Sequence, residues 1–199
     1  MMKLHGRITI GMLRSLRHLT VLLVLLSPPI SAGSAEPELR KLLSEPDHVL
    51  LLRHALAPGT GDPPNFRLSD CASQRNLSPA GREQALRIGK RLRTAGLENT
   101  KVYSSQWCRS LDTARGLNIG SVVELPVLNS FFRSPGRERE QTEALREWIA
   151  SADLKRPVVL VTHQVNITAL TGIYPAEGEI VVLRREQGAL SLVTRLLDE

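Results

Sequence analysis

Two histidines and two arginines stand at the predicted ends of strands, and their side chains suit chemistry on a phosphoryl group. Arg53 and His54 close the apolar run "VLLLRH", and His163 closes a second apolar run, "VVLVTH". Arg109 follows a third short strand, within "YSSQWCRS". Guanidinium groups donate paired hydrogen bonds to phosphate oxygens, and a neutral imidazole is a nucleophile. The four residues together predict an anion site that contains a nucleophile.

Each of these residues also has a purely structural interpretation. In that interpretation, a histidine at a strand end merely caps backbone groups, and Arg109 is a solvated charge on a helix. The occurrence of two histidines at the ends of the two most apolar strands favours the site. His48 precedes its strand and is predicted to lie at the surface.

The elements that would position these residues alternate along the chain between apolar strands and amphipathic helices. Residues 48–54 and 157–163 are continuous apolar runs, typical of strands buried on both faces. Apolar residues recur at helical spacing in 77–96. The other predicted elements are strands at 101–105 and within 121–128, helices through Arg109 and over 137–151, and a hairpin of 179–186 with 189–197.

This order predicts an α/β fold, a three-layer sandwich with a mainly parallel central sheet and a C-terminal antiparallel hairpin. Ligands of such sheets bind beyond the carboxyl ends of the strands. Both strand-ending histidines would therefore lie at one rim. Gln164 and Asn166, just after His163, either line a pocket at this rim or cap the short helix that follows.

The first 35 residues have the pattern of a secretory signal peptide. Four basic residues and no acidic ones precede the apolar run 19–26, and small residues precede Glu36. The apolar run is shorter than the ~20 residues that span a bilayer. We therefore predict a signal peptide over 1–35, one domain over 36–199, a periplasmic or secreted location, and no membrane contact after cleavage. An uncleaved membrane anchor is the alternative.

The charge of the chain gives no reason to expect a nucleic-acid partner. Four of the 26 Lys and Arg residues lie in 1–35, which leaves 22 basic residues against 20 acidic ones. The net charge of 36–199 is therefore only +2.

The two cysteines lie on either side of the predicted helix 77–96. An exported chain with Cys71 and Cys108 is a candidate for one disulfide, and the alternative is that both are unpaired small apolar residues. No CxxC or other metal spacing occurs, which argues against a zinc site. Residues 59–76 are rich in Gly, Pro, Asp, Asn and Ser and are predicted to form a long loop.

Four segments resemble the histidine phosphatase superfamily, which includes phosphoglycerate mutase. They are "LLRHA", with Ala55 where glycine is usual, "RNLSPAGREQA", "YSSQWCRSLDTA" and "VVLVTHQVNI". The leader, the early cysteine and the loop are most similar to exported bacterial members such as lipopolysaccharide heptose-phosphate phosphatases.

The resemblance implies a phosphoric monoester hydrolase with a phosphohistidine intermediate and no metal or cofactor. His54 would be the nucleophile, and Arg53, Arg109 and a protonated His163 would bind the phosphoryl group and stabilise its transfer. Gln164, Asn166 and Asp62 are further candidates for substrate binding. The partner would be a small phosphorylated substrate, such as a sugar phosphate or a component of the cell envelope.

The sequence departs from the family where many members carry a glutamate that protonates the leaving oxygen. That region reads "VLNSFF", with Asn129 or Ser130 near the expected position. The candidates for another acid are Asp62, Glu138, Glu140 and Glu143. Phosphohistidine phosphatases of the superfamily lack this glutamate too, so that activity is one alternative, and a phosphate-binding module of the envelope without catalysis is another.

Overall fold

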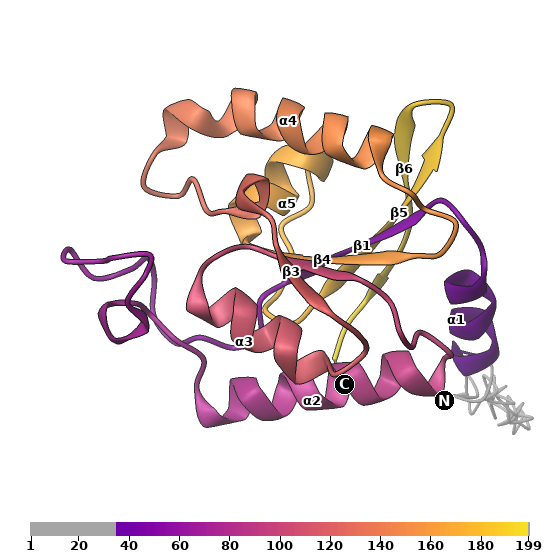
Figure 1. Ribbon diagram of the computed structural model, residues 1–199, viewed down its shortest axis with the longest axis horizontal. Coiled ribbons are helices and arrows are strands. Elements are labelled where there is room, and N and C mark those ends of the chain that lie inside the picture. The colour runs from indigo at the N-terminus through magenta and orange to yellow at the C-terminus, as the bar shows by residue number, and fades with distance from the viewer. Residues whose placement is uncertain (1–34, 199) are drawn as a thin grey trace, which may run out of the picture. The chain divides into compact units, whose positions relative to one another are not determined.

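Two buried strands, β1 (His48–Arg53) and β4 (Val158–Thr162), form the centre of the sheet. They pair in parallel, with Arg53 opposite Thr162, so both strands end at the same rim of the sheet (Figure 1). The computed structural model describes residues 35–198. The predicted signal peptide lies outside these residues except for Ala35, so it stays a prediction.

The sheet has six strands in the order β3-β2-β4-β1-β5-β6. β2 (Val102–Ser104), β3 (Val122–Glu124), β4 and β1 are parallel to one another. β5 (Ile180–Glu186) pairs antiparallel with β1 and forms a hairpin with β6 (Ala189–Leu196). The predicted mainly parallel sheet with a C-terminal hairpin is confirmed.

Helices cover both faces of the sheet and complete the predicted three layers (Figure 1). Leu50 and Leu52 of β1 pack on the side of α1 (Ala35–Ser44), α2 (Pro79–Thr94) and α3 (Cys108–Leu117). Val49 and Leu51 pack on the other side, with α4 (Glu138–Ser151) and α5 (Gln164–Thr171). Short 3₁₀ turns occupy Cys71–Ser73, Pro126–Leu128 and Pro135–Arg137.

Two features differ from the predictions. The helix α1 was not predicted, and its Leu39 and Leu43 are buried against the sheet. His48 was predicted to lie at the surface, and this was wrong because β1 lies between two other strands. The side chain of His48 is buried, and its Nδ1 lies 3.3 Å from the carbonyl oxygen of Glu45.

The helix α3, which carries Arg109, is positioned by close packing against α2. Gly89 of α2 lies directly beneath the backbone of Leu117, where an added Cβ would be 2.0 Å from the carbonyl oxygen. Gly116 of α3 similarly faces Ala85, with 2.9 Å between an added Cβ and the alanine Cβ. The two helices can approach this closely because glycine stands at both contacts.

We predict that Gly89→Ala destabilises the protein by about 2–3 kcal/mol, because the new methyl group must displace backbone rather than a flexible side chain. Urea unfolding measures the change. Gly136→Ala is the matched control, since nothing lies within 4 Å of a Cβ added there. Equal stabilities of the two variants would contradict this account of the helix contact.

Candidate active site

The four residues predicted to form an anion site line one cavity. It has a volume of about 540 Å³ and lies where β1 and β4 end. Arg53, His54, Arg109 and His163 all contribute to its wall. The ring centroids of the two histidines are 5.4 Å apart. The structure therefore brings these residues together as the strand pattern predicted.

The imidazole of His54 is hydrogen-bonded through one nitrogen, and the other has no hydrogen-bond partner among residues 35–198. Its backbone N–H donates to the carbonyl of Thr162 at 2.9 Å, which continues the β1–β4 pairing for one residue. Its Nδ1 lies 2.9 Å from the carbonyl oxygen of Ala55. A carbonyl only accepts, so Nδ1 carries the proton and Nε2 keeps a lone pair. Burial, and then the charge of Arg109, lowers the pKa of His54 well below its usual 6.5.

His163 precedes α5 and is bonded on both ring nitrogens. Its Nε2 lies 2.8 Å from Ser105 Oγ, and its Nδ1 lies 3.4 Å from Nη2 of Arg109. Because the guanidinium only donates, Nδ1 accepts and Nε2–H donates to the serine. Burial, followed by the charges of Arg109 and His54, lowers the pKa of His163 well below 6.5. In this structure the ring is therefore neutral, and the predicted protonated form is not present.

Both predicted arginines keep a buried donor without an acceptor. Arg53 donates from Nη1 to the carbonyl of Pro175 at 2.9 Å, and Arg109 bonds through both terminal nitrogens to Asp62. The Nε of each arginine is buried and has no hydrogen-bond partner among the described residues. Buried N–H groups nearly always have an acceptor. Both arginines line the cavity, where guanidinium groups favour the binding of an anion.

Asp62 lines the cavity, but its contacts argue against the predicted role of proton donor. Its Oδ1 lies 2.7 Å from Nη1 of Arg109, and its Oδ2 accepts from Nε1 of Trp107 at 3.0 Å. Burial alone would raise the pKa of Asp62, but the bonds and charge of Arg109, with the Trp107 bond, lower it overall. The carboxylate stays ionised and holds Arg109 in place.

The other acid candidates lie elsewhere. Glu138, Glu140 and Glu143 are exposed on α4 and do not line the cavity, whose lining on this segment ends at Arg137. Asn129 accepts the backbone N–H of Gln106 at 2.9 Å. These three glutamates are therefore wrong as candidates for the acid.

The two polar residues after His163 have different positions. Gln164 lines the cavity, and its Nε2 also donates to Thr168 Oγ1 at 2.8 Å. Asn166 is buried beneath α5, does not line the cavity, and donates to the carbonyl of Asn129 at 3.0 Å. The amide of Asn166 therefore supports the neighbouring loop, and its predicted role in substrate binding stays a prediction.

Sequence reasoning missed a third arginine and a supporting acid. Arg75 lines the cavity and donates from Nε to the carbonyl of Gly61 at 2.9 Å. Glu177 lies 3.6 Å from Arg53 and 3.7 Å from Arg75, so it partly neutralises both. Arg75 stands inside "RNLSPAGREQA", which was the available signal, whereas nothing near Glu177 pointed to this role.

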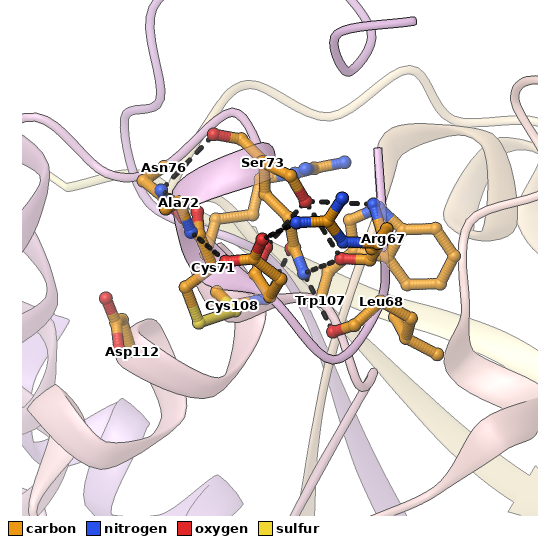
Figure 2. Close-up of a disulfide and its surroundings, with 12 residues drawn as sticks. Arg67, Leu68, Cys71, Ala72, Ser73, Asn76, Trp107, Cys108 and Asp112 are labelled. Carbon is orange, nitrogen blue, oxygen red and sulfur yellow. Dashed lines mark hydrogen bonds and ion pairs between the residues drawn. A yellow bond between two sulfur atoms is a disulfide. The ribbon is translucent and has the colours of Figure 1, made fainter. Parts of the chain in front are cut away.

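A disulfide joins the long loop to the helix that carries Arg109 (Figure 2). It links Cys71 to Cys108, the first residue of α3, with 5.7 Å between their Cα atoms. Asp70 begins the 3₁₀ turn beside it by accepting the backbone N–H of Ala72 at 3.0 Å. The bond holds the loop that carries Asp62 against the helix that carries its partner.

Within residues 35–198, no three His, Cys, Asp or Glu side chains are grouped so that they could hold a metal ion. No helix in that part of the chain has the length and apolar character needed to span a membrane.

We predict that the double substitution of Cys71 and Cys108 by serine lowers the free energy of unfolding by about 3–4 kcal/mol, because the bond closes a long loop. The two cysteines are 37 residues apart in sequence. Urea unfolding with and without dithiothreitol measures the effect. The reductant should destabilise the original chain and leave the variant unchanged. A reductant effect of equal size in both would contradict the assignment.

We predict that stability falls as the pH drops below 6.5, the usual pKa of histidine. Below that pH the unfolded chain binds protons at His54 and His163, whereas the folded chain does not, since both pKa values are lowered. Each histidine contributes up to about 1.4 kcal/mol per pH unit. Urea unfolding between pH 7.5 and 5.5 measures the slope, and His54→Asn should reduce it. An unchanged slope in that variant would rule out this explanation.

A family model supports the resemblance noted in the sequence. The model of the histidine phosphatase superfamily (branch 1) matches residues 49–130, which contain Arg53, His54 and Arg109. No curated protein matches the chain.

Solved structures with the same fold cover most of the described residues. The product of the open reading frame Rv3214 from Mycobacterium tuberculosis aligns with 19% identity over 74% of this chain and 95% of its own, with a TM-score of 0.57. The protein histidine phosphatase SixA in complex with tungstate aligns with 16% identity over 75% of this chain and 96% of its own, with a TM-score of 0.56. A mycobacterial glucosyl-3-phosphoglycerate phosphatase aligns with 18% identity over 73% of this chain and 97% of its own, with a TM-score of 0.53. The chain is therefore similar to the histidine phosphatase superfamily over residues 49–130, and it shares the fold of these solved structures.

Proposed function

We propose that the protein is a phosphatase that hydrolyses phosphomonoesters through a phosphohistidine on His54. The observation that carries this proposal is a neutral imidazole, its Nε2 free, in a cavity where Arg53 and Arg109 each keep a buried Nε–H without an acceptor. A phosphoryl group supplies the oxygen atoms that these donors lack, beside a nucleophile that carries no proton on Nε2.

The reaction then proceeds in two displacements. Nε2 of His54 attacks phosphorus, the N–P bond forms, the ester P–O bond breaks, and the leaving oxygen takes a proton. Water next attacks the phosphorus of the phosphohistidine, the N–P bond breaks, and inorganic phosphate leaves while a proton is released. The arginines stabilise charge on the equatorial oxygens in both steps, which is most of what phosphoryl transfer requires.

His163 would contribute to this stabilisation after the substrate binds. A dianionic phosphoryl group near the ring opposes the positive charge of Arg109 and so raises the pKa of His163. Ser105 orients the ring through its contact with Nε2. In this account His163 becomes protonated only when the phosphoryl group is bound.

The leaving group is expected to need little protonation. Asp62, the carboxyl group that lines the cavity, is paired with Arg109 and ionised. An acid at the leaving oxygen contributes ~10²–10⁴ in rate, so its absence favours substrates with stable leaving groups. This observation favours a second candidate function, hydrolysis of protein phosphohistidine, which is the activity named for the similarly folded SixA.

The proposal includes export and metal independence. A disulfide beside the site is the kind of bond that persists in oxidising compartments, which supports a periplasmic or secreted protein. Arg53, Arg75 and Arg109 supply the positive charge that a metal supplies in other phosphatases. Activity that survives extensive dialysis against EDTA would agree with metal independence.

We predict that His54→Asn lowers the hydrolysis of 4-nitrophenyl phosphate by about 10⁴-fold or more, because the nucleophile is removed. His48→Asn is the matched control, since His48 is equally buried at the other end of β1. It should keep most of the activity if it folds, as judged by circular dichroism.

Labelling distinguishes the proposed enzyme from a phosphate-binding module without catalysis. The original chain, denatured in alkali during turnover of ³²P-labelled ester, should carry label on His54 by peptide mapping, and His54→Asn should carry none. Hydrolysis by a pure preparation of His54→Asn, or an unlabelled original chain with no turnover, would overturn the proposal.

A further inference from the structure

The outer part of the cavity carries two arginines that the proposed chemistry does not use. Arg133 and Arg137 line the cavity and are exposed. Within residues 35–198, neither has a carboxylate within ion-pair distance, although Arg109 pairs with Asp62 in the inner part. The outer pair is therefore a source of uncompensated positive charge at the edge of the site.

Both arginines belong to the segment that connects β3 to α4. Arg133 donates from Nη1 to the carbonyl of Pro63 at 3.1 Å, so its guanidinium lies against the long loop. Arg137 is the residue before α4, whose N-terminus adds partial positive charge. The carboxylates nearest in sequence, Glu138 and Glu140, are exposed and do not line the cavity.

The cavity also has aromatic residues in its wall. Phe132 and Tyr174 line it with 52% and 69% of their surfaces exposed. Phe66 stacks on Trp107 with ring centroids 5.2 Å apart. Large aromatic side chains provide apolar area for the flat face of a ring or sugar. A volume of about 540 Å³ is that of a small-molecule site, and it leaves much room beyond one phosphoryl group.

We propose that the substrate carries a second anionic group, a phosphate or a carboxylate, which Arg133 and Arg137 bind. The phosphoryl group that is cleaved lies at His54, the second anion lies at the two outer arginines, and a ring or sugar between them covers Phe132. This inference rests on the proposed function and adds to it the class of substrate. Arg133 and Arg137 determine specificity and take no part in the displacement.

Three aryl phosphates with closely matched leaving groups test this substrate class. They are 4-methylphenyl phosphate, 4-(carboxymethyl)phenyl phosphate and 4-(phosphonomethyl)phenyl phosphate. The first has no second anion, and the other two carry a carboxylate and a non-hydrolysable phosphonate. We expect the original chain to prefer at least one of the anionic esters in kcat/KM at low ionic strength, chiefly through KM. The comparison of these two esters distinguishes a carboxylate from a phosphate.

Neutral variants of the outer arginines connect that preference to the residues. The double variant Arg133→Gln, Arg137→Gln should lower kcat/KM for the preferred anionic ester by about fivefold or more, since two exposed ion pairs are lost. Hydrolysis of 4-methylphenyl phosphate should change less than twofold. Arg139→Gln is the matched control, because Arg139 is exposed on α4 and does not line the cavity.

The outcomes separate this inference from the proposed function. Equal hydrolysis of all three esters by the original chain, or an equal effect of the double variant on all three, would refute the second-anion site and leave the phosphatase in place. Hydrolysis of 4-nitrophenyl phosphate but of none of the three esters would also refute the second-anion site alone. If the original chain hydrolyses neither these esters nor 4-nitrophenyl phosphate, the proposed function fails, and the inference fails with it.

Discussion

Parallel pairing of β1 with β4 is the constraint on which the site depends. The two strands run side by side in register, and the pairing continues into the backbone bond between His54 and Thr162. Because neighbouring parallel strands end at one rim, the residues that follow them, His54 and His163, are forced into proximity. A slip of one strand by one residue would turn its side chains to the opposite face of the sheet and would shift one histidine relative to the other.

The positive charge gathered at this rim is balanced only in part. Arg109 has Asp62 as its partner, and Arg53 and Arg75 share Glu177 at longer distances. Such charges are costly to bury unless they are paired. Burial first, and then this uncompensated positive charge, lowers the pKa of both histidines and keeps them neutral. The protein thus holds charge that a phosphoryl group would neutralise.

The sequence predicted the sheet and its rim because those features depend on local patterns. Continuous apolar runs identified the central strands, and their ends identified His54 and His163. The same patterns could not predict which loop residues contact one another at the site. Arg75 and Glu177 are 102 positions apart, and no periodicity relates two loop residues that meet only in the folded chain. Asn166 shows the same limit, since the two-residue step from Gln164 to Asn166, about half a turn of α5, separates a side chain at the cavity from one in the protein interior.

The long loop between β1 and α2 becomes a wall of the cavity through a few separate contacts, although it has little regular structure of its own. The Cys71–Cys108 bond and the bond from the backbone N–H of Cys108 to Gln74 Oε1 join it to the start of α3. The Asp62–Arg109 ion pair joins it one residue further along that helix. All three contacts converge on the first turn of the helix that carries the catalytic arginine of the proposed reaction. Since phosphoryl transfer depends on positioning, the loop and the arginine can be expected to keep their geometry, or lose it, together.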